Sequence, residues 1–76
     1  MKDLVLYIAK ALVDNPGNVE VKEVAGEKAT VIELKVAEGD RGKVIGKEGR
    51  IIKSIRTIVN SASAKIDKRA TVEIIE

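Results

Sequence analysis

Two glycines separated by two residues are the residues best placed to do chemistry in this sequence. Gly46 and Gly49 flank Lys47 and Glu48, and we call these four residues the 46–49 loop. Glycine adopts backbone angles that other residues avoid, and it has no side chain to keep a ligand away from the backbone. A helix that begins after the loop would offer unpaired N–H groups and the positive end of its dipole. Phosphate is a natural ligand for such a site.

The charge along the chain is uneven, and its basic part contains this loop. Residues 41–69 carry a net charge of +7, whereas residues 1–40 carry −3 and residues 70–76 carry −2. A basic block of this kind is a candidate footprint for a polyanion, and a solvated basic helix face is the alternative. The basic residues of segment 65–69 are either a solubilising loop or a second contact with the same polyanion.

Other glycine-based phosphate motifs do not fit. A Walker A loop needs four residues between its glycine and a Gly-Lys-Ser/Thr sequence, but only three separate Gly42 from Gly46, and Glu48 stands where the hydroxyl should be. A Rossmann fingerprint would need glycine in place of Val44 and a strand directly before the loop. Both nucleotide-binding motifs are therefore excluded, and an ordinary turn between two helices remains as the structural alternative.

The composition excludes most other kinds of site. The 76 residues include neither cysteine nor histidine, which removes disulfides, the usual zinc sites and the commonest general base. No nucleophile–base pair is apparent, so we expect no enzyme activity, no cofactor, no metal and no small-molecule substrate. Tyr7 is the only aromatic residue, so readers that stack bases on aromatic rings are excluded, and we expect Tyr7 to pack or to lie in an interface.

The length and hydropathy predict one soluble domain. A chain of 76 residues has room for a single small core, so residues 1–76 are expected to form one domain. The longest apolar run, residues 4–9, is too short to cross a bilayer. The chain does not open with a signal-peptide pattern, and we expect a cytosolic protein.

Hydrophobic spacing predicts the elements that must position the loop. Apolar residues three and four apart predict helices, and alternation predicts strands. The expected order is a helix with Asp3 as N-cap that ends before Pro16, strands at residues 19–24 and 30–36, helices at 40–45 and 50–62, a polar connection at 63–69 and a strand at 71–75. The stripe of the longer helix consists of Ile51, Ile52, Ile55, Ile58, Val59 and Ala62.

This order of elements predicts an α+β domain. Ile32, Leu34 and Val36 alternate with mixed residues, so one face of that strand is expected to be buried, as are Val72 and Ile74 in the last strand. The second and last strands enclose two helices, so they are expected to be parallel neighbours joined by a right-handed crossover. We therefore expect a three-stranded sheet, with the first strand at its edge, covered by helices on one face.

The segment around the loop resembles the signature of a KH domain. An aliphatic pair, Val44-Ile45, precedes the Gly-x-x-Gly sequence, and an isoleucine-rich helix follows it. The element order helix-strand-strand-helix-helix-strand resembles the bacterial, type II KH arrangement. With its Ala-Leu-Val-Asp-Asn-Pro run at residues 11–16, the chain is similar to the small stand-alone bacterial RNA-binding proteins of the KhpA type. This resemblance covers essentially the whole chain.

The resemblance implies a way of binding RNA. KH domains hold about four single-stranded nucleotides beside a Gly-x-x-Gly loop that contacts the backbone. Here it implies that the 46–49 loop forms the clamp, that Arg50 and Lys53 neighbour phosphates, and that Lys43 belongs to the same RNA-binding set. Val44, Ile45, Ile52 and one strand residue would form an apolar floor beneath the bases, although core packing is the alternative for Val44 and Ile52.

One residue departs from a simple positive clamp. Glu48 places a carboxylate beside Lys47, so affinity is expected to depend mainly on backbone N–H groups and flanking basic residues. Glu48 would otherwise cap the start of the following helix.

The function implied is that of a single-stranded RNA-binding protein, a post-transcriptional regulator or RNA chaperone. Its implied partners are a second copy of the chain or a larger KH-containing protein of the KhpB type. The alternative is a dimerisation adaptor with a KH fold in which RNA binding is secondary.

Overall fold

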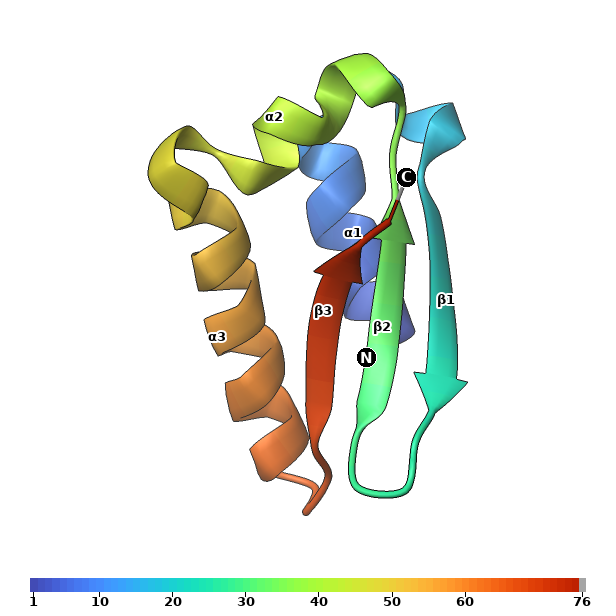
Figure 1. The fold of residues 1–76 in the computed structure, drawn as a ribbon, viewed down its shortest axis with the longest axis vertical. Coiled ribbons are helices and arrows are strands. Elements are labelled where there is room, and N and C mark those ends of the chain that lie inside the picture. Colours follow the sequence, from blue (N-terminus) through green and yellow to red (C-terminus); the bar gives the residue numbers. More distant parts are fainter. Residues whose placement is uncertain (76) are drawn as a thin grey trace.

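The computed structural model describes residues 1–75 and has the predicted order of elements (Figure 1). The helices and strands are α1 (Lys2–Leu12), β1 (Glu20–Ala25), β2 (Thr30–Lys35), α2 (Arg41–Ile45), α3 (Arg50–Ala64) and β3 (Ala70–Ile74). Short 3-10 turns at Pro16–Asn18, Glu38–Asp40 and Lys47–Gly49 join them. The predicted α+β class is confirmed, and the arrangement is that of a type II KH fold.

The three strands form one mixed sheet with β2 in the centre. β1 pairs antiparallel with β2, and Val21 lies opposite Leu34. β3 pairs parallel with β2, and Ile32 lies opposite Val72. The expected parallel pairing is therefore confirmed, and β1 and β3 are both edge strands. Two helices and the loop between them connect β2 to β3, because parallel neighbours need a long crossover.

The core lies between one face of the sheet and the helices. Figure 1 shows α1 behind the sheet and α3 beside β3, so that the other sheet face is open. Ile32, Leu34 and Val72 are fully buried on the covered face. Val5 and Ala9 of α1 and Val59 of α3 are fully buried as well. The buried alternation predicted for the second strand is thus correct, and Val36 just after β2 is buried as well.

Several local predictions were wrong. Asp3 is not the N-cap of the first helix, because α1 begins at Lys2 and Asp3 lies in its first turn. Residues 63 and 64 belong to α3 and not to a polar connection, and the buried Ser63 hydroxyl donates to the Val59 carbonyl at 2.8 Å. Ile58 is 47% exposed although it belongs to the predicted apolar stripe. Tyr7 is 75% exposed, so it does not pack within the domain, and its alternative role in an interface stays a prediction.

Candidate nucleic-acid interface

The 46–49 loop is a tight connection between the end of α2 and the start of α3. Gly46 ends α2, and its N–H donates to the Gly42 carbonyl at 2.9 Å. The N–H of Gly49 then donates to the Gly46 carbonyl at 3.1 Å, which closes a single turn. α3 begins directly after it, at Arg50. The loop therefore lies at the N-terminal end of a 15-residue helix, where the dipole favours anions.

The two glycines are required for different reasons. Gly46 has φ 75° and ψ 172°, a conformation that is essentially restricted to glycine. A Cβ atom there would lie 2.5 Å from Cγ1 of Ile51. Gly49 has φ 72° and ψ 18°, which is left-handed helical backbone, and the nearest atom to a Cβ there would be 3.9 Å away. Gly46 thus lets α2 and α3 approach closely, whereas Gly49 requires only its backbone angle.

Glu48 does not cap α3. The N-cap position of α3 is Gly49, and the hydrogen bond that the Glu48 carboxylate accepts comes from the Arg50 side chain and not from a backbone N–H of the helix, so the predicted capping role was wrong. Glu48 itself has φ 57° and ψ 24°, which is unusual for a residue with a Cβ. Its carboxylate accepts a hydrogen bond from Arg50 Nη2 at 3.4 Å, between two side chains that are both mostly exposed. The carboxylate is therefore turned toward Arg50, and the pairing in water is weak.

The basic residues expected at the loop fall into two groups. Lys47, Arg50 and Lys53 are exposed, and within residues 1–75 neither of the two lysines forms an ion pair. Lys43, by contrast, donates from Nζ to Asp14 Oδ2 at 2.7 Å. The hydrogen bond and charge of Asp14 raise the pKa of Lys43. Lys43 is therefore held against the end of α1, and Lys47, Arg50 and Lys53 are the cations that the loop presents to solvent.

A buried carboxylate that the sequence did not single out fixes α2 in place. Asp40 is only 2% exposed, and it accepts hydrogen bonds from the backbone N–H of Asp14 at 3.3 Å and of Asn15 at 3.0 Å. The Asn15 side chain donates a third, at 3.1 Å. Burial by itself raises the pKa of this group, but these bonds and the charge of Lys43 outweigh it, so the pKa of Asp40 is lowered. The chain reversal after α1 is thereby tied to the start of α2.

The apolar residues expected in the floor differ in accessibility. Val44 is fully buried and Ile52 is 6% exposed, so core packing accounts for both side chains. Ile45 is 36% exposed, and of these three it offers the largest apolar surface to a base. The role of all three toward RNA stays a prediction.

One face of α3 continues the basic surface away from the loop. Arg50, Lys53, Thr57, Asn60 and Ala64 are spaced by three or four residues and are all exposed, so they form one stripe along the helix. No acidic residue occurs in α3. Beside the stripe, Arg56 Nε donates to the Val72 carbonyl at 3.0 Å, which ties α3 to the edge strand β3. Sequence patterning did not predict this bond, because it depends on how the helix packs.

Other kinds of site are not apparent in the described part of the chain. Residues 1–75 contain no cluster of three or more side chains from His, Cys, Asp and Glu that could hold a metal ion. None of the helices within the same residues combines the length and the apolar character needed to span a bilayer.

Comparison with known proteins identifies a family and relatives for this chain. The family model described as "KhpA/KhpB, KH domain" matches residues 2–74. A protein of Caldanaerobacter subterraneus subsp. tengcongensis named "RNA-binding protein KhpA" is 60% identical over 75 residues, which are 99% of this chain and all of that protein. Proteins with the same name from Clostridium perfringens and Aquifex aeolicus are 57% and 51% identical, and the alignments cover 99% and 100% of this chain and 100% and 96% of theirs. These relatives are named as RNA-binding proteins, not as enzymes.

Proposed function

Because this chain belongs to the KhpA/KhpB KH-domain family, we propose that it binds single-stranded RNA and that the 46–49 loop grips the RNA backbone. The observation that carries the proposal is the placement of this loop. It lies at the N-terminal end of α3, it exposes Lys47 beside Arg50 and Lys53, and its close helix approach depends on Gly46. Relatives that align along their whole length are named RNA-binding proteins.

The grip is proposed to be a backbone grip of modest strength. Backbone N–H groups at the start of α3 and the three exposed cations would contact two to four phosphates. Counterion release of ~0.7 per phosphate on a single strand then predicts a log–log salt slope of roughly −1.5 to −3. The bases would be read weakly, because only a limited apolar surface at Ile45 lies next to the loop. Relaxed sequence preference is therefore part of the proposal.

The test replaces the loop without disturbing its fold. Changing both glycines would be uninformative, because a side chain at position 46 collides with Ile51. We therefore use Lys47→Glu together with Gly49→Asp, because position 49 is open and aspartate tolerates left-handed backbone. The matched control is Lys22→Glu with Gly17→Asp, which makes the same changes of residue type where Lys22 is exposed and a Cβ at Gly17 meets nothing within 4 Å.

The loop variant should lose binding to single-stranded RNA in fluorescence anisotropy while its far-UV circular dichroism stays unchanged. The control variant should bind like the parent protein. Equal binding by parent and loop variant would contradict the clamp.

We further propose that the protein works with a second KH domain, supplied by another copy of itself or by a larger protein of the KhpB type. A single weak site gains from a second one through effective concentration. Tyr7, Ile58 and Ile66 are 75%, 47% and 56% exposed and supply apolar surface for such contacts. Action as a post-transcriptional regulator or RNA chaperone in the cytosol would follow from this mode of binding.

The same exposed apolar residues support a second candidate function, a dimerisation adaptor in which RNA binding is secondary. The loop variant separates the two. If the clamp is the function, the loop variant keeps its oligomeric state in sedimentation but fails to retain RNA in cells. An adaptor would keep both its partners and its cellular role in that variant.

A further inference from the structure

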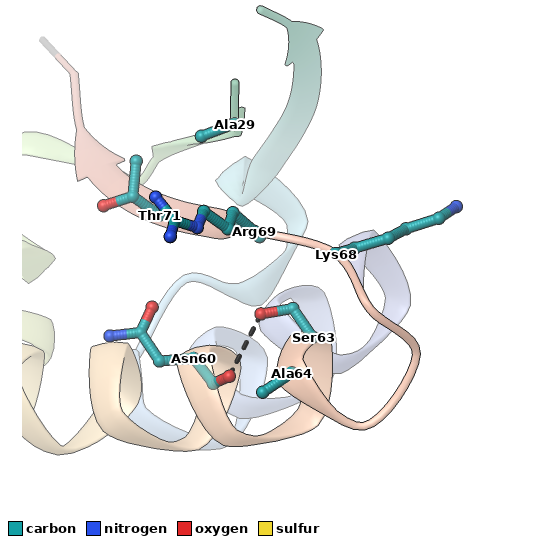
Figure 2. Close-up of a pocket in the computed structure, with 8 residues that line it drawn as sticks. Ala29, Asn60, Ser63, Ala64, Lys68, Arg69 and Thr71 are labelled. Carbon is teal, nitrogen blue, oxygen red and sulfur yellow. Dashed lines mark hydrogen bonds between the residues drawn. The ribbon is translucent and has the colours of Figure 1, made fainter. Parts of the chain in front are cut away.

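A pocket whose lining is mostly apolar lies at the far end of α3 from the 46–49 loop. It has a volume of about 340 Å³ and is formed between the last turns of α3 and the start of β3. Asn60 and Arg69 contribute polar side chains to it from opposite sides, and Thr71 lies next to Arg69. Figure 2 shows the Asn60 amide and the Arg69 guanidinium facing the same space, whereas the ammonium end of Lys68, which also lines the pocket, extends away from them.

The polar groups at this pocket match the chemistry of a nucleotide. A guanidinium offers a forked set of donors that suits phosphate oxygens. An amide is both donor and acceptor, as hydrogen bonding to the edge of a base requires. Within residues 1–75, no ion pair engages Arg69, so its charge is available to a ligand. A volume of about 340 Å³ falls at the small end of ordinary ligand sites, which suits one nucleoside unit.

The pocket and the loop are connected by a single helix face. Asn60 and Ala64, which line the pocket, belong to the same stripe of α3 as Arg50 and Lys53. Since α3 has no acidic residue, a polyanion that leaves the loop along this stripe meets no carboxylate on the helix. Arg56 occupies the neighbouring position and joins the helix to β3.

We propose that this pocket is a second nucleotide site on the same RNA strand, so that the binding site is longer than the segment held at the loop. Arg69 would take a phosphate and Asn60 the edge of a base. The proposal rests on RNA binding at the 46–49 loop and adds a distal contact to it. At 1.5 Å per residue, Asn60 lies about 15 Å along the helix from Arg50. A stacked strand that advances ~3.4 Å per nucleotide needs about four further steps to reach it.

The experiment compares oligouridylates of four, eight and twelve nucleotides in anisotropy titrations at 0.15 M salt. The parent protein should bind the eight-mer and twelve-mer more tightly than the four-mer. Arg69→Gln should weaken binding of the two longer strands about fourfold, because a slope of ~0.7 per phosphate has that effect at this salt concentration. It should also reduce the magnitude of their salt slope by ~0.7. Binding of the four-mer should stay within about twofold of the parent value.

Two further variants separate the pocket from general charge. Lys65→Gln removes the same charge from a nearby exposed residue that does not line the pocket, and should change binding by less than about twofold. Asn60→Ala should weaken binding of the longer strands about fivefold without changing the salt slope, because it removes a hydrogen bond and not a charge. Both residues are exposed, so the fold should be retained.

The outcomes distinguish this inference from the proposed function. If Arg69→Gln has no effect at any length, or weakens all lengths equally, the distal site is wrong even though the loop binds RNA. An equal loss in Lys65→Gln and Arg69→Gln would show diffuse attraction and also overturn the pocket. Absence of RNA binding by the parent protein at every length would refute the proposed function itself.

Discussion

The different geometry of the two loop glycines gives a sharp prediction about stability. Alanine at position 46 would occupy backbone angles that cost ~1–3 kcal/mol for a residue with a Cβ. It would also place that Cβ 2.5 Å from Cγ1 of Ile51, and overpacking of this kind costs ~1–3 kcal/mol. Replacing glycine also lowers the conformational entropy of the unfolded chain, which stabilises the folded state by ~0.4–1 kcal/mol. These terms sum to ~1–5.6 kcal/mol, so Gly46→Ala should lower the free energy of unfolding by about 3 kcal/mol.

Alanine at position 49 should be tolerated much better. Left-handed backbone angles cost an alanine ~1–2 kcal/mol, and the lower conformational entropy of the unfolded chain offsets part of this cost, as at position 46. No heavy atom lies closer than 3.9 Å to the added Cβ, so there is no packing cost. Gly49→Ala should lower the free energy of unfolding by about 1 kcal/mol or less. The whole free energy of unfolding of a domain of this length is only about 4–11 kcal/mol, so the two variants should differ measurably in stability.

Urea unfolding followed by far-UV circular dichroism measures both values. In thermal unfolding, each kcal/mol of lost stability should lower the Tm of a domain of this size by about 4–8 °C. A double-mutant cycle with Ile51→Ala isolates the collision, because the smaller side chain makes room for the new Cβ. The Gly46→Ala/Ile51→Ala pair should recover ~1–3 kcal/mol relative to the sum of the single changes. Equal destabilisation at positions 46 and 49, or strict additivity in the cycle, would refute the reasoning.

Three other predictions follow from the contacts around the loop. Asp40→Asn should destabilise the protein, because an amide supplies one fewer acceptor for the donors of residues 14 and 15. The pKa of Asp40 is lowered in the folded state, so the charged carboxylate stabilises the fold above the unfolded-state pKa, and this stabilisation is lost as pH falls through the folded-state pKa. Urea midpoints measured from neutral to acid pH should show this loss in the parent protein and not in Asp40→Asn. Glu48→Gln should raise RNA affinity about two- to fourfold at 0.15 M salt in anisotropy titrations, because it removes the carboxylate beside the proposed phosphate contact, and an unchanged affinity would place the RNA elsewhere. Arg56→Met should cost about 1–2 kcal/mol in urea unfolding, since the Val72 carbonyl loses its donor, and a neutral effect would mean that water replaces the guanidinium without penalty.

Much of the fold could be predicted because the spacing of hydrophobic residues indicates which segments are helices and which are strands. Alternation at Ile32 and Leu34 marks a strand with one covered face, and both are fully buried. The helical spacing of Ile52, Ile55 and Val59 likewise marks the buried face of α3. Ile58 shows the limit of this reasoning. It follows the apolar spacing, but it lies at the margin of the stripe, and about half of it stays exposed.

The position of the candidate site could be predicted from the sequence, but the contacts of its individual residues could not. The Gly-x-x-Gly spacing located the loop, yet it could not show that position 46 is sterically closed and position 49 open, because that depends on where Ile51 lies after folding. Residue type made Lys43 look equivalent to Lys47, and only tertiary packing places it against Asp14. The prediction of an N-cap at Asp3 failed locally, since α1 begins at Lys2, two residues before the start that an N-cap at Asp3 would give.

The carboxylate of Asp40 has a consequence for how this protein can change over evolutionary time. Its three donors come from residues that precede it by about 25 positions, yet all of them depend on one side chain. A substitution at position 40 would leave those donors without their acceptor, and a substitution of Asn15 would remove one of the bonds that stabilise the buried charge. Positions 15 and 40 should therefore covary among related chains. Substitutions just after α1 should also be limited, because the residues there bind the carboxylate that precedes α2.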